Sequence, residues 1–390
     1  MEKIPFNKLF ISEKESSYIT QAIASGSIAG NGRFTRACCR LMEERFGIHE
    51  VLLTPSCTAA LEMAAMLCDL GPGDEVIVPS FTFVSTVNAF VRQGAKPVFV
   101  DIRPDTMNLD ETLIEDAITE RTKTIWPVHY AGVGCEMERI MSIARGYDLL
   151  VVEDAAQGVD AFYNGRALGS IGHLGTYSFH ETKNCTSGRG GALCINHPPF
   201  AERAEMIHDN GTNRQAFLRG EVDHYTWTGL GSSYVPGEIV AAFLYAQLEM
   251  LDLIGQQRRE VHQFYRRQLE PLEAEGFLTL PSIPEECTPN DHMFYILLPD
   301  RETRDGLLAY LHSRGIQAVF HYVPLHSSPM GQKFGYCRDD LPVTEDVSGR
   351  LLRLPFYYTI REDEQLRTVE EIRRFAESNV LQEAAYRLSP

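Results

Sequence analysis

Short apolar runs alternate with longer amphipathic stretches from about residue 50 to residue 190, and this rhythm restricts the fold more than any other feature of the chain. The apolar runs lie at residues 51–53, 75–79, 97–100, 124–128 and 149–152, and segments with helical periodicity, such as residues 136–145, lie between them. Such alternation predicts a mostly parallel sheet covered by helices on both faces. Ligands of these sheets bind beyond the carboxyl ends of the strands, so the residues after each strand are the candidates for a functional site.

The rhythm ends after residue 190, which indicates a second structural unit. Residues 238–270 contain few glycines and are typical of one or two long helices, and residues 293–298, 304–314 and 317–320 suggest a smaller α/β unit. A chain of 390 residues is also too long for one typical core. We therefore expect a large domain at residues 1–250 and a small C-terminal domain at residues 251–390.

The composition argues against several classes of function. The formal net charge of -17 repels phosphate backbones and anionic lipids, so we expect no nucleic-acid or membrane partner. The nine cysteines form no CxxC pair and show no zinc spacing, so we expect free thiols and no metal site. The sequence starts without a long apolar segment, and no later run approaches a membrane span. These features favour a cytoplasmic protein.

A polar turn, Thr54-Pro55-Ser56, joins the first strand to a helix that starts near Cys57 and Thr58. Small residues and free backbone N–H groups at a helix N-terminus form a ready site for a phosphate group. A serine or threonine at this position is also a common helix cap, so the turn alone does not distinguish the two.

An acidic pair, Glu153 and Asp154, ends the apolar run at residues 149–152. A carboxylate at the end of a buried strand costs free energy unless it has a partner. The nitrogen of a pyridine ring is one such partner, because a carboxylate keeps that nitrogen protonated and the ring able to accept electrons. A helix cap or a surface turn would explain the same residues.

Lys183 lies between Ser178 and the glycine-rich run Gly188-Arg189-Gly190-Gly191. Most lysines are solvated surface charges, but an aldehyde cofactor needs an amine that is desolvated, so that its pKa falls. The phosphate turn, the acid and the lysine follow one another in the chain order expected of fold-type I enzymes that use pyridoxal 5'-phosphate (PLP).

These clusters, together with residues 79–86, 101–108, 128–132 and 320–326, resemble the sugar-nucleotide aminotransferases of the DegT/DnrJ/StrS family over nearly the whole chain. The resemblance implies the fold of a fold-type I PLP-dependent aminotransferase. It also implies that Lys183 binds PLP as a Schiff base and shuttles a proton, that Asp154 pairs with the pyridine nitrogen, and that Gln157 lies at the phenolic oxygen. The remaining cofactor residues implied are Phe83, which would stack on the ring, and Cys57, Thr58 and Ser178, which would hold the phosphate.

The resemblance further implies a sugar pocket that receives residues from two parts of the chain. The implied substrate residues are Ser27, Ile28 and Gly30 in the N-terminal segment 1–35, and His321, Tyr322 and His326 near the C-terminus. The implied reaction transfers the amine of L-glutamate to C4 of a dTDP-4-keto-6-deoxyhexose, with the galacto product favoured. The implied assembly is a homodimer with its active sites at the interface.

Three alternative functions fit these residues less well. A PLP-dependent 3-dehydratase of the same family would have a histidine at position 183, where this chain has Lys183. A regulator that kept only the fold is disfavoured by the intact set of Lys183, Asp154 and Gln157. A Rossmann dehydrogenase would need a third glycine after Gly132-Val133-Gly134, where the chain has Met137.

Overall fold

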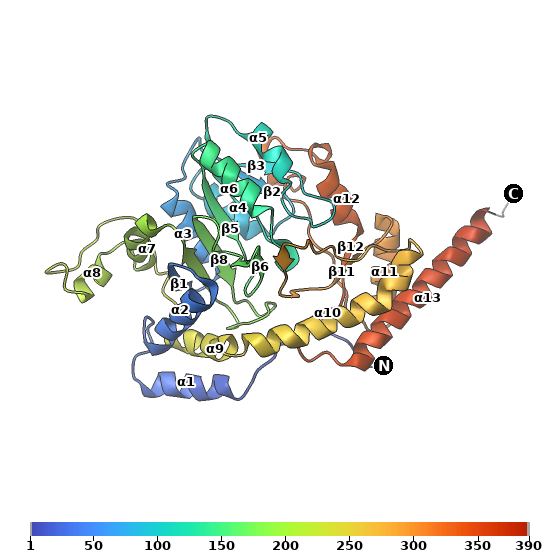
Figure 1. Ribbon diagram of the computed structural model, residues 1–390, viewed down its shortest axis with the longest axis horizontal. Helices are drawn as coiled ribbons and strands as arrows, with labels where there is room; N and C mark the ends of the chain where they lie inside the picture. Colours follow the sequence, from blue (N-terminus) through green and yellow to red (C-terminus); the bar gives the residue numbers. More distant parts are fainter. Residues whose placement is uncertain (1, 388–390) are drawn as a thin grey trace.

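A seven-stranded sheet forms the centre of the first 250 residues (Figure 1). The computed structural model describes the backbone of residues 2–387 and the side chains of residues 2–378. The strand order is β1-β9-β8-β5-β4-β2-β3; the pairs from β8 to β3 are parallel, and β9 runs antiparallel to both β1 and β8. The strands are β1 (Glu50–Thr54), β2 (Glu75–Pro79), β3 (Lys96–Val100), β4 (Thr122–Ile125), β5 (Leu150–Asp154), β8 (Leu174–Ser178) and β9 (Gly191–Ile195).

Helices cover both faces of this sheet, because its strands are apolar on both sides. In β2, Val76 and Val78 pack into the core on one face, and Ile77 packs into the core on the other. Successive residues of a strand point to opposite faces, so a wholly apolar strand must be buried on both. The Ile77 side carries α2 (Arg33–Phe46), α6 (Met137–Gly146) and α9 (Glu238–Leu248), and the other side carries α3 (Cys57–Leu67), α4 (Val84–Val91) and α7 (Ala201–His208). The predicted α/β fold class is confirmed.

Two consecutive helices lead from the sheet to the C-terminal part of the chain. Figure 1 shows α10 (Leu251–Ala274) running from the end of α9 towards α11 (Arg301–Ser313) and α13 (Glu362–Arg387). The C-terminal part has its own apolar core, to which α10, α11, α13 and β12 (Leu351–Arg353) contribute. We retain residues 1–250 and 251–390 as proposed domains, because their boundary falls at the junction of α9 and α10. The second proposed domain also contains β11 (Tyr295–Leu297) and α12 (Pro342–Arg350).

Two short segments make strand contacts with the other proposed domain. Ile4, near the N-terminus, forms a β-bridge with Ile316 of the second domain. From the second domain, β10 (Cys287–Thr288) pairs with β6 (Phe162–Tyr163) of the first, and β6 also pairs with β7 (Arg166–Ala167). Residues 317–320 join the small β11–β12 sheet only through a bridge between Val319 and Arg353. The two domains are therefore connected by more than the helix junction.

The segment between α7 and α9 projects from the body of the molecule at the left of Figure 1 and carries α8 (Arg214–Leu218). At the bottom of the same view, α1 (Lys14–Ala24) packs along α9. The remaining helices are the short α5 (Ile114–Ala117) and five 3₁₀ turns, at Glu111–Leu113, Tyr130–Gly132, Pro198–Phe200, Gly331–Phe334 and Arg338–Asp340. Within residues 2–387, no helix combines the length and the apolar character that a membrane crossing requires.

Candidate active site

The strand ends bring the predicted phosphate turn, Ser178 and Asp154 together at one edge of the sheet. Ser178 is the last residue of β8 and pairs with Gly191 of β9. A side chain on Gly191 would collide with the backbone of Cys57, so its absence lets β9 pass directly against the start of α3. Asp154 is the last residue of β5 and pairs with Thr176, also in β8. The three clusters are thus neighbours, as their positions after parallel strands predicted.

The N-terminus of α3 is capped on one side and open on the other. Ser56 Oγ accepts a hydrogen bond from the backbone N–H of Ala59 at 3.1 Å. In the part of the chain that the structure describes, the backbone N–H groups of Cys57 and Thr58 have no such partner. The Thr58 hydroxyl lies 2.8 Å from that of Ser85. This helix end can therefore donate to an anion through two N–H groups.

Asp154 is buried, with 5% of its surface exposed, and neutral groups hold it in place. Its Oδ2 accepts from Thr86 Oγ1 at 2.7 Å, and its Oδ1 accepts from the backbone N–H of Ala156 at 3.0 Å. No lysine or arginine forms an ion pair with it among the described side chains. Because a carboxylate has four acceptor positions, Asp154 can still accept from a cationic N–H group.

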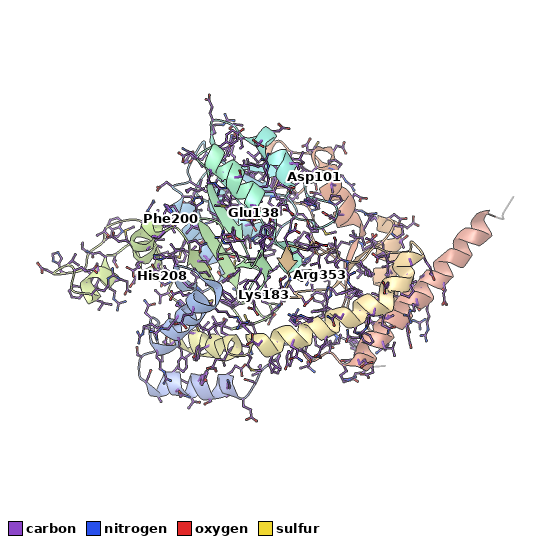
Figure 2. All side chains as sticks on the ribbon, viewed as in Figure 1. Asp101, Glu138, Lys183, Phe200, His208 and Arg353 are labelled. Atoms are coloured by element: carbon purple, nitrogen blue, oxygen red, sulfur yellow. The ribbon has the colours of Figure 1, made fainter. Side chains whose placement is uncertain are left out.

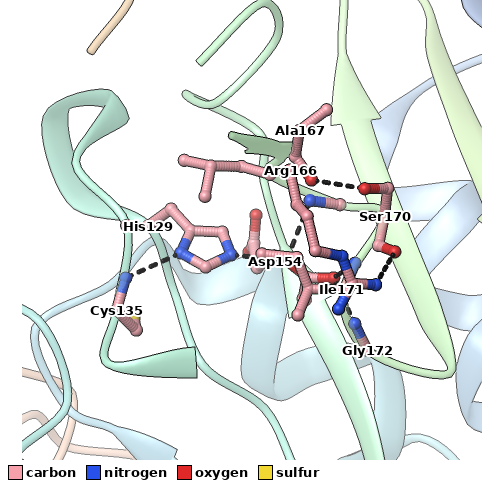
Figure 3. A network of polar contacts seen from close by, with 12 residues as sticks. His129, Cys135, Asp154, Arg166, Ala167, Ser170, Ile171 and Gly172 are labelled. Atoms are coloured by element: carbon pink, nitrogen blue, oxygen red, sulfur yellow. Dashed lines mark hydrogen bonds and ion pairs between the residues drawn. The ribbon is translucent and has the colours of Figure 1, made fainter. Parts of the chain in front are cut away.

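The neighbouring Glu153 is part of a different network, which Figure 3 shows around His129. Both side chains have 0% of their surface exposed, and His129 Nε2 donates to Glu153 Oε2 at 2.9 Å. The same carboxylate accepts from the backbone N–H groups of Gly169, Ile171 and Gly172 at 2.8, 2.6 and 2.5 Å. His129 Nδ1 accepts from the backbone N–H of Cys135, which fixes the ring tautomer. Glu153 therefore fixes the end of β5. The next residue, Asp154, points to the opposite face of the sheet.

Lys183 lies in the loop between β8 and β9, and its half-buried side chain lines a small cavity together with Gln157, Ser178 and His292. Burial lowers the pKa of Lys183 to about 8; the positive charge of Arg353 acts in the same direction, and Asp154 opposes it. An amine with this pKa has a substantial neutral fraction at pH 8, and the neutral form can add to a carbonyl group. A desolvated amine with a lowered pKa is the property expected of a lysine that binds an aldehyde cofactor.

A cluster of polar and aromatic side chains from the second domain closes the site on the side of Gln157. Gln157 Nε2 donates to Tyr322 Oη at 3.0 Å, and its Oε1 accepts from the backbone N–H of Ala131 at 2.7 Å. The Tyr322 ring stacks on His321, with centroids 4.1 Å apart. Arg353 Nη1 donates to His321 Nε2 at 2.6 Å, and Figure 2 shows Arg353 and Lys183 in the central part of the molecule. The predicted residues His321 and Tyr322 are thus linked to Gln157.

His326 lies elsewhere, in a buried network that fixes its own loop. Its side chain has 0% of its surface exposed, and Nδ1 lies 2.7 Å from Ser80 Oγ. Its Nε2 lies 3.7 Å from Glu345, and its backbone N–H donates to Ser80 Oγ at 3.0 Å. With both ring nitrogens facing protein atoms, His326 is better described as an anchor of the loop than as a substrate contact.

The N-terminal turn that carries Ser27, Ile28 and Gly30 contacts the start of α9 instead of the Lys183 loop. The backbone N–H of Glu238 donates to Ile28 O at 3.1 Å, and a side chain on Gly30 would collide with Pro236. The Glu238 carboxylate accepts from three backbone N–H groups at the start of α2, including that of Phe34 at 2.9 Å. Within one chain, this turn is therefore fixed to α9 and does not join the cluster around Lys183.

Arg353, Thr86 and His292 belong to the site but were not predicted from the sequence. Arg353 interrupts the apolar run Leu351-Leu352-Arg353-Leu354, and 8% of its surface is exposed. A charged residue inside an apolar run is the signal that singled out Asp154, so the same test applied to β12 would have found it. Thr86 had no comparable signal, because a threonine in a helix is common.

The profile of the DegT/DnrJ/EryC1/StrS aminotransferase family matches residues 10–373. The chain belongs to this family. It is 38% identical to a pleiotropic regulatory protein of Geobacillus stearothermophilus over 81% of this chain and 82% of that protein. It is 30% identical to the spore coat polysaccharide biosynthesis protein SpsC of Bacillus subtilis, over 95% of this chain and 96% of SpsC. Protein Spr1654 of Streptococcus pneumoniae, solved in its PLP form, superposes with a TM-score of 0.89 at 25% identity, covering 97% of this chain and 99% of that one.

Membership of this family confirms the predicted family, fold class, enzyme class and cofactor: the chain is a PLP-dependent aminotransferase. The residues at the sheet edge fit that cofactor. The start of α3 offers two free N–H groups to a phosphate, and Asp154 can accept from a ring nitrogen. Phe83, at the start of α4, leaves 58% of its surface exposed and offers an aromatic face beside Thr86. Lys183 supplies an amine whose pKa is lowered by burial to about 8.

Proposed function

We propose that this aminotransferase moves the amine of L-glutamate to C4 of a dTDP-4-keto-6-deoxyhexose, giving a dTDP-4-amino-4,6-dideoxyhexose, with the galacto product favoured, and 2-oxoglutarate. The observation that carries the proposal is that Lys183, with its lowered pKa, and the buried acid Asp154 both belong to one edge of the sheet, although they form no ion pair. The sugar-nucleotide substrate follows from the resemblance of the motifs, and the polysaccharide role in the name of SpsC is consistent with it.

In the proposed mechanism, the bound cofactor supplies an electron sink through its protonated pyridine ring. Lys183 would hold the cofactor, and its Nζ would move a proton to and from the amine-bearing carbon of the substrate. Asp154 would keep the ring nitrogen protonated, and Phe83 would stack on the ring. The Cys57 and Thr58 N–H groups and the Ser178 hydroxyl would hold the phosphate. Gln157 would offer its remaining N–H to the phenolic oxygen.

For the sugar, we propose that His321 and Tyr322 contact the substrate, since their rings belong to the cluster that closes the Lys183 site. Burial lowers the pKa of His321, and the charge of Arg353 adds to the effect, so the ring is neutral and accepts the arginine N–H. The N-terminal turn at Ser27, Ile28 and Gly30 would reach a substrate only in the partner subunit of a dimer.

The first test of the function is a stoichiometric assay. We expect purified enzyme, given dTDP-4-keto-6-deoxyglucose and glutamate, to form one equivalent of 2-oxoglutarate for each equivalent of amino sugar. NMR of the product gives the configuration at C4, and the same assay with UDP- or GDP-linked 4-keto sugars examines the nucleotide.

Loss of the C3 hydroxyl without consumption of glutamate would contradict the proposal and support a 3-dehydratase. Failure to convert either substrate, in protein that holds its cofactor, would favour a regulator. That second outcome has a specific interest, because one relative of the chain is named a regulatory protein.

We also propose that the enzyme is a cytoplasmic homodimer held partly by the projecting segment around α8. Five large apolar side chains of this segment are exposed, namely Phe217, Leu218, Tyr225, Trp227 and Leu230, and Trp227 has 77% of its surface exposed. Contiguous exposed apolar groups of this kind mark surfaces that bind another protein. A second copy of the chain is the partner that the family resemblance implies.

Light scattering coupled to size exclusion checks the homodimer. We expect twice the chain mass for the wild-type protein and a shift towards the monomer for the double variant Trp227→Asp, Leu230→Asp, because a buried aspartate at the interface lacks a partner. Met330→Asp, which places the same charge on an exposed methionine outside the segment, is the control. A double variant that stays dimeric at micromolar concentration would exclude this segment from the interface.

A further inference from the structure

An unpartnered donor and an unpartnered acceptor line the same cavity in the Lys183 site. Within the described part of the chain, neither Lys183 Nζ nor His292 Nε2 has a hydrogen-bond partner or an ion pair. His292 has 5% of its surface exposed, and its Nε2 is not sealed off by the surrounding atoms, so this nitrogen faces the cavity. The cavity has a volume of about 10 Å³, which leaves no room for a substrate group.

The hydrogen bond at the other ring nitrogen decides which nitrogen of His292 can accept. Asn184 Nδ2 donates to the carbonyl oxygen of Asn290 at 2.8 Å, so Asn184 presents its Oδ1 to the imidazole. This oxygen can only accept, and it lies 2.8 Å from His292 Nδ1, which therefore carries the ring proton. In a neutral imidazole the second nitrogen is then an acceptor, and in His292 that nitrogen is Nε2.

The ring stays neutral in the pH range in which Lys183 titrates. Burial lowers the pKa of His292 well below its ordinary value. Its charged and titratable neighbours act in the same direction, and they are Lys183, Arg258, Arg353 and His321. Burial lowers the pKa of Lys183 only to about 8. His292 therefore accepts a hydrogen bond without taking the proton.

The other polar side chains around the cavity have partners or proposed roles. Both side-chain N–H groups of Asn290 donate to backbone carbonyl oxygens, at 2.8 and 2.7 Å. Gln157 donates to a tyrosine hydroxyl at 3.0 Å, and its other N–H and the Ser178 hydroxyl are assigned to the cofactor in the proposed function. Among the described residues that line the cavity, Lys183 is the charged donor that remains for His292 Nε2.

We propose that His292 Nε2 accepts a hydrogen bond from the Lys183 amine whenever that amine is not bonded to PLP. This inference rests on the proposed role of Lys183. The bond fixes one N–H of the amine and so limits the directions in which its lone pair can point during proton transfer. His292 is a positioning residue, because it acts on the reacting carbon only through Lys183, and Asn184 in turn holds the imidazole.

Two substitutions separate the two ring nitrogens. His292→Asn keeps an amide donor near the position of Nδ1, where Asn184 accepts, and removes the acceptor at Nε2. His292→Gln places an amide oxygen near the position of Nε2 and so restores the acceptor. His49→Asn, at an exposed histidine outside the site, is the matched control.

The first readout is the pKa of the Lys183 amine in enzyme loaded with pyridoxamine 5'-phosphate, the aminated cofactor, which does not bond to the lysine. Labelling with acetic anhydride at several pH values, followed by mass spectrometry of the Lys183 peptide, measures this pKa. We expect His292→Asn to lower it by about one unit, because the ammonium form loses an acceptor. His292→Gln and His49→Asn should keep the wild-type value.

The second readout is the reaction of PLP-loaded enzyme with L-glutamate, followed by the loss of the visible absorption of bound PLP. We expect His292→Asn to lower the rate at saturating glutamate on the order of 10-fold. The glutamate concentration that gives half this rate should not change, because the bond acts on proton transfer and not on donor binding. His292→Gln should recover most of the rate, and His49→Asn should react as the wild type does.

Other outcomes overturn the inference. A normal His292→Asn enzyme with an impaired His292→Gln enzyme would show that the ring serves only to hold Asn184. Equal losses in both variants, with a lowered Tm and an unchanged pKa of Lys183, would make His292 a structural residue. Borohydride reduction that places PLP on another lysine of the wild-type protein would refute the proposed role of Lys183, and this inference with it. That mapping precedes the comparison of variants, so the two failures are distinguishable.

Discussion

Replacing Lys183 by alanine is expected to abolish the visible absorption of bound PLP and to lower turnover on the order of 10⁴-fold or more, while the protein still folds. In the proposed mechanism this amine binds the cofactor and moves the proton, so a single change would remove both functions. The fold should survive, because Lys183 lies in a loop and forms no ion pair among the described residues. Circular dichroism and thermal unfolding check the fold, and steady-state kinetics with glutamate check turnover.

Borohydride reduction followed by peptide mapping locates the bound cofactor directly. We expect one modified peptide, containing Lys183, in the wild-type protein and in the control Lys333→Ala, which alters an exposed lysine. Modification of another lysine in the wild-type protein would show that Lys183 is not the cofactor-binding residue. Lys183→His should likewise stop steady transamination, since an imidazole does not bind the cofactor covalently as an amine does.

Asp154→Asn is expected to preserve the fold and to lower turnover on the order of 10²-fold or more, equivalent to about 3 kcal/mol of transition-state stabilisation. The amide oxygen can still accept from Thr86 or Ala156, so the local hydrogen bonds are largely kept. A neutral amide cannot hold a proton on the ring nitrogen, and the ring then accepts electrons poorly.

Asp148→Asn makes the same chemical change at an exposed turn and should leave turnover unaltered, because asparagine tolerates the positive φ of 54° found there. Both variants are compared by kcat and by thermal unfolding. Near-normal turnover in Asp154→Asn would mean that Asp154 serves only to cap the turn that follows β5.

The residues at strand ends were predictable because their positions depend on short-range pattern. An apolar run defines a strand, and the parallel topology places its end at the ligand edge whatever the details of packing. This reasoning located Asp154, Ser178, Lys183 and the start of α3, and the structure places Ser178, Asp154 and α3 side by side.

Contacts between distant segments were not predictable in this way. His326 hydrogen bonds with Ser80, 246 positions away in the chain, and nothing local to either residue indicates that pairing. The link from Gln157 through Tyr322 and His321 to Arg353 depends on how β12 lies against the large domain. Likewise, Glu238 caps α2 from the start of α9, which ties the N-terminal turn away from Lys183.

The adjacent acids Glu153 and Asp154 have a consequence for how the protein reaches its native state. Neighbouring residues of a strand point to opposite faces, so a shift of β5 by one position would exchange them. Glu153 would then lose His129 and the three amides of the turn before β8, and an unpaired carboxylate would be buried. Correct alignment of β5 and correct placement of Asp154 at the edge of the sheet are therefore one event during folding, and a chain that mispairs this strand misplaces both acids.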